Sequence, residues 1–304
     1  SLETAGMPVV KGGSANLVRA FSSLIEDNGG AIRCGTDVDE IVVSEKKAKG
    51  VILTSGQELR ASKAVIANVT PTQLYQRLLR NTPIPEQVSK AASQFRYGRS
   101  NMQIHLALDS KPEWVDQQLN DVPMIHVTEG VSSICESINS ADAGYLPRRP
   151  TIVVGQPAAL DISRVPEGKW ILWLQLQELP RQVLGDEADI ISVPKSGEWT
   201  EALREAYADR VMERLSQVLP GLSERILKRV VLSPADLEKL NMNLVGGDPY
   251  SGDCKLDQNL LWRPLAATRN HETPIKNLYH IGASTHPGPG LGGGSGYQVG
   301  KALN

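Results

Sequence analysis

A glycine-rich run near the C-terminus constrains this chain more than any other feature of its sequence. Eight of the nineteen residues from Gly282 to Gly300 are glycine. The apolar stretch before the run, residues 278–281, predicts a short buried strand, and a helix is expected to begin near Ser295. A strand, a glycine loop and a helix N-terminus let backbone amides approach an anion without side chains in the way. The pattern therefore predicts a site for a large anionic cofactor.

The composition narrows the class of protein. A chain of 304 residues with 40% hydrophobic residues can form one large domain or two lobes. The net charge of -2 and the lack of a basic stripe argue against a nucleic-acid partner. The three cysteines are far apart and no histidine pair has metal-ligand spacing, so we expect no metal site. Because no apolar run approaches about 20 residues, we expect a cytoplasmic protein, with contact to a membrane surface as an open alternative.

Residues 1–70 have the pattern of a small α/β unit. Apolar residues recur at helical spacing after Ser14, the candidate N-cap, and Asn28-Gly29 is expected to end that helix. A tight turn is predicted at Ser55-Gly56. Short strands are predicted at residues 31–34, 38–44, 50–54, 58–61 and 64–67.

Residues 71–270 have a different texture and predict an inserted α+β domain. Residues 203–218 have the apolar spacing of a long amphipathic helix. Strands are predicted at residues 102–108, 151–154, 170–176 and 226–232, and helices after Pro71 and from Ser233. The expected fold class is a mixture of α/β and α+β, in which residues 1–70 and 271–304 are two pieces of one α/β domain.

Two stretches resemble the phytoene desaturase-like branch of FAD-dependent oxidoreductases, which is related to the amine oxidase and glutathione reductase-type flavin folds. The first comprises residues 12–20, 28–41 and 64–68. The second and more specific one contains Gly282-Ala-Ser-Thr-His-Pro-Gly288 at a strand end. Residues 243–248 and 261–264 also resemble this family's approach to the flavin.

The resemblance implies a partial glutathione reductase-type FAD-binding domain, made of residues 1–70 and 271–304, with an inserted substrate domain at residues 71–270. It implies FAD as the cofactor, with the backbone of Val38 at the adenine. It also implies cofactor contacts along the strand end and the glycine run, at Gly282, Ala283, Gly288, Gly290, Leu291, Gly292, Gly293 and Gly294.

The sequence departs from the family pattern in one respect. Such enzymes begin with a strand, a Gly-x-Gly-x-x-Gly turn and a helix, and this pattern does not occur here. We therefore expect the chain to correspond to the C-terminal portion of such an enzyme. A missing N-terminal segment or a partner chain would supply the first pyrophosphate contacts and the ribose contact.

The resemblance implies hydride transfer from a lipophilic small-molecule substrate to the flavin. Two alternatives stay open: a flavin-dependent, non-redox polyene isomerase, and an inactive substrate-domain fragment that binds an apolar ligand or a partner. We assign no catalytic residue, and His286 is only a candidate proton relay. We favour a role for His286 in shaping its turn by hydrogen bonding, because the cofactor carries the chemistry.

Several other polar residues have both a site interpretation and a structural one. Asn68 lies where a strand is expected to end near the cofactor, and the two roles fit it equally well. Asp248 is expected to be a solvated loop carboxylate, and Arg263 is weighed as a counter-charge for the cofactor. His280 lies within the last strand and is expected to pack in the core.

Overall fold

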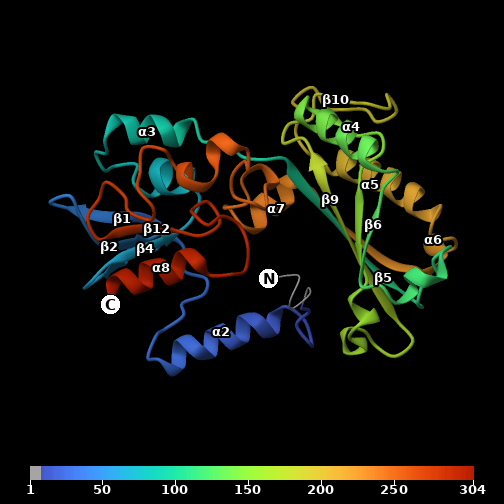
Figure 1. Cartoon of the computed structure of the whole chain (residues 1–304), viewed down its shortest axis with the longest axis horizontal. Helices are drawn as coiled ribbons and strands as arrows, with labels where there is room; N and C mark the ends of the chain where they lie inside the picture. The colour runs from blue at the N-terminus through green and yellow to red at the C-terminus, as the bar shows by residue number, and fades with distance from the viewer. Residues whose placement is uncertain (1–7) are drawn as a thin grey trace. The chain divides into compact units, whose positions relative to one another are not determined.

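In the computed structural model of this chain, residues 8–304 are described, and they form two compact units (Figure 1). We call the first the five-stranded unit. It comprises Asn101–Ser233 and the described part of residues 1–34. We call the second the glycine-loop unit, which comprises Gly35–Ser100 and Pro234–Asn304.

Two small sheets organise the glycine-loop unit. The first is antiparallel and consists of β1 (Val38–Ser44), β2 (Lys47–Leu53) and β3 (Glu58–Arg60), in that order. The second pairs β4 (Val65–Asn68) with β12 (Leu278–Ile281) in parallel. The helical elements are η1 (Gln73–Leu78), α3 (Glu86–Ser93), α7 (Pro234–Leu240), η5 (Val245–Gly247), η6 (Leu256–Gln258), η7 (Leu260–Trp262) and α8 (Gly294–Leu303). The predicted turn between β2 and β3 is confirmed, and Gly56 adopts φ +84° there.

The pairing of β12 with β4 joins two segments that lie far apart in the sequence. Leu278 is opposite Val65, and the register continues to Ile281 opposite Asn68. Parallel strands cannot be joined by a tight hairpin, so a long connection between them is required. This pairing confirms the expectation that the last strand returns to the strand that ends at residue 68.

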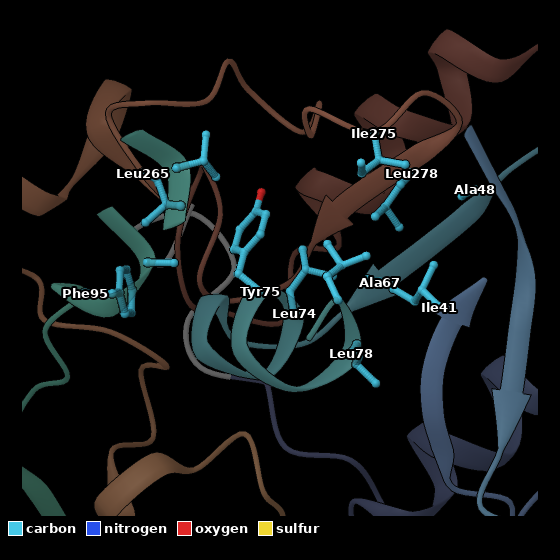
Figure 2. Packing of buried hydrophobic residues seen from close by; sticks show 13 residues of the cluster. Ile41, Ala48, Ala67, Leu74, Tyr75, Leu78, Phe95, Leu265, Ile275 and Leu278 are labelled. Carbon is cyan, nitrogen blue, oxygen red and sulfur yellow. The ribbon is translucent and has the colours of Figure 1, made fainter. Parts of the chain in front are cut away.

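The core of the glycine-loop unit is formed by side chains from both sheets and from η1 (Figure 2). Ile41, Ala67 and Leu278 contribute from β1, β4 and β12. The η1 segment is a π-helix in which the N–H of Leu79 donates to the carbonyl oxygen of Leu74 at 3.0 Å. Leu74 and Leu79 are both fully buried, so this wide helical turn is held by core packing.

The five-stranded unit is built on one sheet with the order β11-β5-β9-β8-β6. These strands are β5 (Ser100–Leu108), β6 (Met124–Val127), β8 (Ile152–Gly155), β9 (Trp170–Leu179) and β11 (Ile226–Leu232). β7 (Tyr145–Leu146) and β10 (Gly185–Asp186) form a short parallel pair. The helical elements are α2 (Ala15–Asp27), η2 (Gln117–Asp121), α4 (Val131–Asp142), η3 (Pro157–Ala159), η4 (Ile162–Arg164), α5 (Glu201–Ser216) and α6 (Leu222–Arg225).

Burial alternates along β5 and β9, which gives the sheet one buried face and one more open face. Helix α5 contacts β11, and its Tyr207 and Val211 are fully buried. Its N-cap, Thr200, accepts a hydrogen bond from the N–H of Leu203 at 3.3 Å. The predicted amphipathic helix is therefore confirmed. Within residues 8–304, no helix has both the length and the apolar composition needed to cross a membrane.

Two local expectations at the N-terminal end need correction. Helix α2 forms where predicted, but Ser14 occupies the N-cap position without a side-chain capping bond, and Phe21 is 56% exposed. The strand expected at residues 31–34 does not form. A strand needs a neighbouring backbone to satisfy its N–H and C=O groups, and none of the described strands pairs with this segment.

The units divide the chain near residues 34, 100 and 233, whereas the sequence patterns placed boundaries at 70 and 270. Leu74 and Phe95 pack in the core of the glycine-loop unit, which draws residues 71–100 into it. Leu265 does the same for the segment that follows residue 233. The roles of FAD-binding domain and substrate domain stay predictions.

Candidate cofactor site

The candidate site lies at the carboxyl edge of the parallel pair β4 and β12. β4 ends at Asn68 and β12 at Ile281, and these two residues are opposite each other in the register. The glycine run follows Ile281 directly, and α8 follows the run (Figure 1). In open α/β sheets, ligands bind outside the carboxyl ends of the strands. The predicted order of strand, glycine loop and helix is thus confirmed.

The start of the loop is fixed from several directions. The N–H of Gly282 donates to the Oγ of Ser295 at 3.1 Å. The Nε of Arg263 donates to the carbonyl oxygen of Ala283 at 3.0 Å. Gly282 has φ +105°, and a Cβ at this position would overlap the side-chain oxygen of Asn68. Glycine is therefore required here for both conformation and space.

The middle of the loop is open where side chains would stand. An added Cβ would meet no atom within 4 Å at four of its glycines: Gly288, Gly290, Gly292 and Gly293. Three of them have positive φ angles, of 106°, 144° and 62°, whereas Gly292 does not. At Gly294, by contrast, a Cβ would lie 3.0 Å from the Cγ of Pro287, so this glycine serves packing. The backbone of residues 288–293 is thus accessible to direct contact with a ligand.

Helix α8 presents its N-terminus beside this open backbone. Its N-cap is Gly293 in the left-handed conformation, and no side chain caps the helix. The first N–H groups of a helix have no intrahelical partners, and the N-terminus carries a partial positive charge. Leu291 and Tyr297, 91% and 70% exposed, flank this helix start. The arrangement offers backbone donors and partial positive charge to an anionic group.

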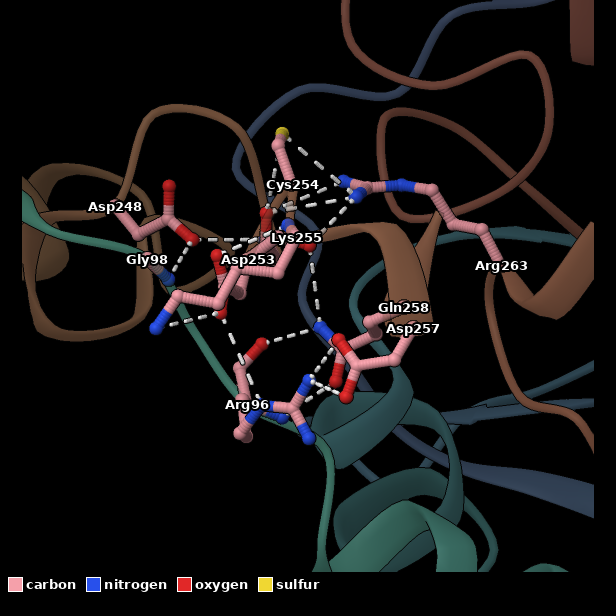
Figure 3. Close-up of polar contacts among 10 residues, drawn as sticks. Arg96, Gly98, Asp248, Asp253, Cys254, Lys255, Asp257, Gln258 and Arg263 are labelled. Carbon is pink, nitrogen blue, oxygen red and sulfur yellow. Dashed lines mark hydrogen bonds and ion pairs between the residues drawn. The ribbon is translucent and has the colours of Figure 1, made fainter. Parts of the chain in front are cut away.

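Arg263 uses its donors within the protein (Figure 3). It is 2% exposed, and it donates to the carbonyl oxygens of Ala283 at 3.0 Å, Tyr250 at 2.7 Å and Asp253 at 3.2 Å. Burial lowers the pKa of its guanidinium. Because carbonyl groups take up these donors, Arg263 ties residues 250–253 to the glycine loop. This favours a structural role over that of a counter-charge for a cofactor.

Asp248 is fully buried, so the expectation of a solvated carboxylate was wrong. Its two oxygens accept hydrogen bonds from the N–H groups of Gly98 at 2.8 Å, Tyr250 at 2.7 Å and Gly252 at 2.8 Å. A short acidic side chain that accepts several backbone donors organises a turn. Asp248 therefore holds the segment that Arg263 connects to the glycine loop.

The two histidines of the strand and loop differ in environment. His280 is 1% exposed, its Nε2 donates to the carbonyl oxygen of Val69 at 2.7 Å, and its ring packs edge-on against Tyr75. Burial lowers the pKa of His280 to about 4, so it is neutral near pH 7, and its predicted place in the core is confirmed. His286 is half-buried, and its Nδ1 is buried without a hydrogen-bond partner among residues 8–304. This nitrogen does not support the favoured turn-shaping role.

The structure brings nearly all the predicted cofactor residues into the loop between β12 and α8, but it places Val38 elsewhere. Val38 begins β1, in the three-stranded sheet, and its carbonyl oxygen accepts a hydrogen bond from Arg77 at 2.9 Å. The adenine contact assigned to its backbone stays a prediction. Asn68 lies at the strand end, as expected, and its side chain lies against Gly282.

Two residues that position the site were missed by the sequence patterns. Ser295 holds Gly282, and the Oδ1 of Asn243 accepts a hydrogen bond from the N–H of Thr70 at 3.0 Å. The second contact brings the segment that begins at Asn243 to the end of β4. A serine in the first turn of a helix is a weak signal for the first contact, and no local pattern signals the second.

Comparisons with known proteins place these features in context. No family profile matches the sequence. The chain is 28% identical over 297 residues to the pyridine nucleotide-disulfide oxidoreductase domain-containing protein 2 of Rattus norvegicus, covering 94% of this chain and 49% of that protein. It is 28% identical over 289 residues to the neurosporene-forming phytoene desaturase of Cereibacter sphaeroides, covering 95% and 52%. The chain thus spans about half the length of the curated relatives it matches.

A solved oxidoreductase structure from Methanosarcina mazei matches with a TM-score of 0.55 and 17% identity, covering 90% of this chain and 50% of that one. This likeness concerns the fold, which is of the mixed α/β oxidoreductase type. The curated relatives confirm the resemblance to phytoene desaturase-like, FAD-dependent oxidoreductases.

FAD is the cofactor that this class implies, and the residues of the loop fit it. The open glycine backbone leaves room for a large flat group, and the uncapped start of α8 offers donors to an anion.

Proposed function

We propose that this chain provides one half of the cofactor site of an FAD-dependent oxidoreductase of the desaturase type. The observation that carries the proposal is the open glycine backbone of residues 288–293, at the carboxyl edge of β4 and β12. FAD, when bound, supplies the ability to accept a hydride or an electron pair from a substrate C–H bond. The similarity to phytoene desaturases supports this class of reaction. An N-terminal segment or a partner chain supplies the remaining contacts.

The residues of the chain divide the work of binding. The backbone of residues 288–293 admits the cofactor closely, because no side chain stands in its way. The N–H groups at the start of α8 donate to its electron-rich edge and favour negative charge there. Ser295 and Arg263 hold the strand end in place through Gly282 and Ala283. The half-buried His286 can hold a proton beside the bound cofactor.

The five-stranded unit supports a lipophilic substrate. A cavity of about 320 Å³ lies on the open face of its sheet, and Ile171, Trp173 and Val230 are among its lining residues. Small-molecule sites commonly have volumes of roughly 300–1,000 Å³ and mostly apolar walls. This cavity is therefore the place where we expect an apolar substrate to be held.

Gly292→Leu tests the cofactor site most sharply. A Cβ at Gly292 meets no protein atom and its φ is not positive, so the variant should fold like the parent chain. We expect its affinity for FAD to fall at least about tenfold, or about 1.4 kcal/mol, because the side chain occupies the space of the cofactor. FAD binding is measured by the change in flavin fluorescence on titration.

Gly300→Leu is the matched control. Gly300 also has open space at its Cβ, but it lies in the body of α8. This variant should bind FAD like the parent chain. Equal binding of FAD by Gly292→Leu and Gly300→Leu would refute the assignment of the glycine run as the cofactor site.

A further inference from the structure

The open face of the sheet in the five-stranded unit carries a cavity with an apolar floor. β11, β5 and β9 are neighbours in the sheet, and they contribute Ala107, Ile171, Trp173 and Val230 to the lining, with Pro157 from η3. Gly155 is opposite Trp173 in the β8–β9 register, and a Cβ on Gly155 would overlap the indole ring. The glycine therefore lets the indole lie against β8 and form part of a flat apolar surface.

The charged residues of this cavity are all basic or titratable to a cation. They are Arg164, Lys228 and His105, and no carboxylate side chain is among the lining residues. Lys228 is opposite the small residue Ala107 in the β11–β5 register, so its stem has room beside the apolar floor. In the described part of the chain, neither Arg164 nor Lys228 forms an ion pair with a carboxylate.

A carboxylate that interacts with Arg164, that of Asp161, is already engaged. It accepts the hydroxyl of Ser163 at 2.6 Å and the N–H of Gly12 at 2.6 Å. These hydrogen bonds, and to a smaller degree the charge of Arg164, lower the pKa of Asp161. Because the carboxylate is shared among several donors, Arg164 keeps positive charge available to a ligand.

We propose that this cavity binds a small amphiphile that has an apolar body and a carboxylate at one end. The apolar body packs on Trp173 and Ile171, and the carboxylate pairs with Lys228 and Arg164 at the rim. Charge complementarity selects the anionic end, because a pure hydrocarbon gains nothing from two cations at the mouth of its site. That this amphiphile is the substrate rests on the proposed function, whereas its binding requires no FAD.

The test uses the full chain without FAD. The probe is cis-parinaric acid, a fluorescent polyene carboxylate, and its methyl ester is the neutral match. Energy transfer from tryptophan to the polyene reports binding. We expect the acid to bind saturably and more tightly than the ester. Lys228→Gln and Arg164→Gln should each weaken binding of the acid by about twofold to fivefold, the range for ion pairs at accessible sites, and leave the ester unchanged.

Lys195→Gln is the matched control, because Lys195 is an exposed lysine of the same unit that does not line the cavity. It should change neither affinity. Equal affinities for acid and ester would overturn the proposal, as would a signal that appears only when the acid is presented in lipid vesicles. An FAD titration of the same samples separates the two proposals, since failure to bind FAD together with selective binding of the acid would refute only the cofactor site.

Discussion

Protonation of His280 should be a main source of acid sensitivity in the glycine-loop unit. This side chain is 1% exposed, and burial lowers its pKa from 6.5 to about 4. Below pH 6.5 the unfolded chain binds a proton that the folded chain does not, so stability falls as the pH falls. The loss grows until the pH reaches the folded pKa, where it amounts to about 3 kcal/mol at 1.36 kcal/mol per pKa unit.

His280→Gln isolates this effect, because glutamine can still donate to the carbonyl oxygen of Val69 but does not titrate. We expect the parent chain to lose about 2–2.5 kcal/mol more than this variant between pH 7 and about pH 4.5. The free energy of unfolding is measured in urea at both pH values by circular dichroism. Hydrogen exchange of peptides that contain β12 reports the glycine-loop unit separately.

His126→Gln is the control, because His126 is exposed on β6. It should keep the pH dependence of the parent chain. If parent and His280→Gln lose equal stability over this pH range, His280 is not held neutral by burial, and the packing described for β12 is incorrect.

The remaining predictions concern the fixed end of the loop. Gly282→Ala should lower the free energy of unfolding by about 1–3 kcal/mol, because Gly282 has φ +105° and its Cβ would overlap Asn68. Asn68→Ala in the same chain should recover only the part due to overlap, and full recovery would show that the backbone conformation carries no cost. Arg263→Leu should cost about 2–4 kcal/mol in urea unfolding, because it leaves buried carbonyl groups unsatisfied. A loss below about 0.5 kcal/mol would contradict the bridging role of this side chain.

The elements that the sequence predicted are those whose signals are local. The alternation along residues 170–176 and the helical spacing of residues 203–218 correspond to β9 and α5, because side-chain periodicity reflects one buried face. The glycine run was predictable for the same reason, since a chain with so little side chain must lie where backbone is needed. The strand expected at residues 31–34 failed because strand formation depends on a partner that local sequence does not report.

The long-range contacts of the site were not predictable from the sequence. Asp248 resembles a loop carboxylate until the fold brings Gly98 to it, and Arg263 resembles a free cation until carbonyl groups of two segments surround it. Neither contact has a short sequence signature, because the partners lie many residues apart. Sequence reasoning thus predicted which segment forms the site but not the side chains that hold it.

The most direct test of the account is an amide NMR titration of the chain with FAD. This experiment detects weak as well as tight binding and locates it by residue. We predict saturable shifts of the glycine amides in residues 288–294 and of the first residues of α8, with amides of β9 unchanged. If these glycine amides do not shift, or if the shifts lie in other parts of the chain, the glycine run is not the cofactor site.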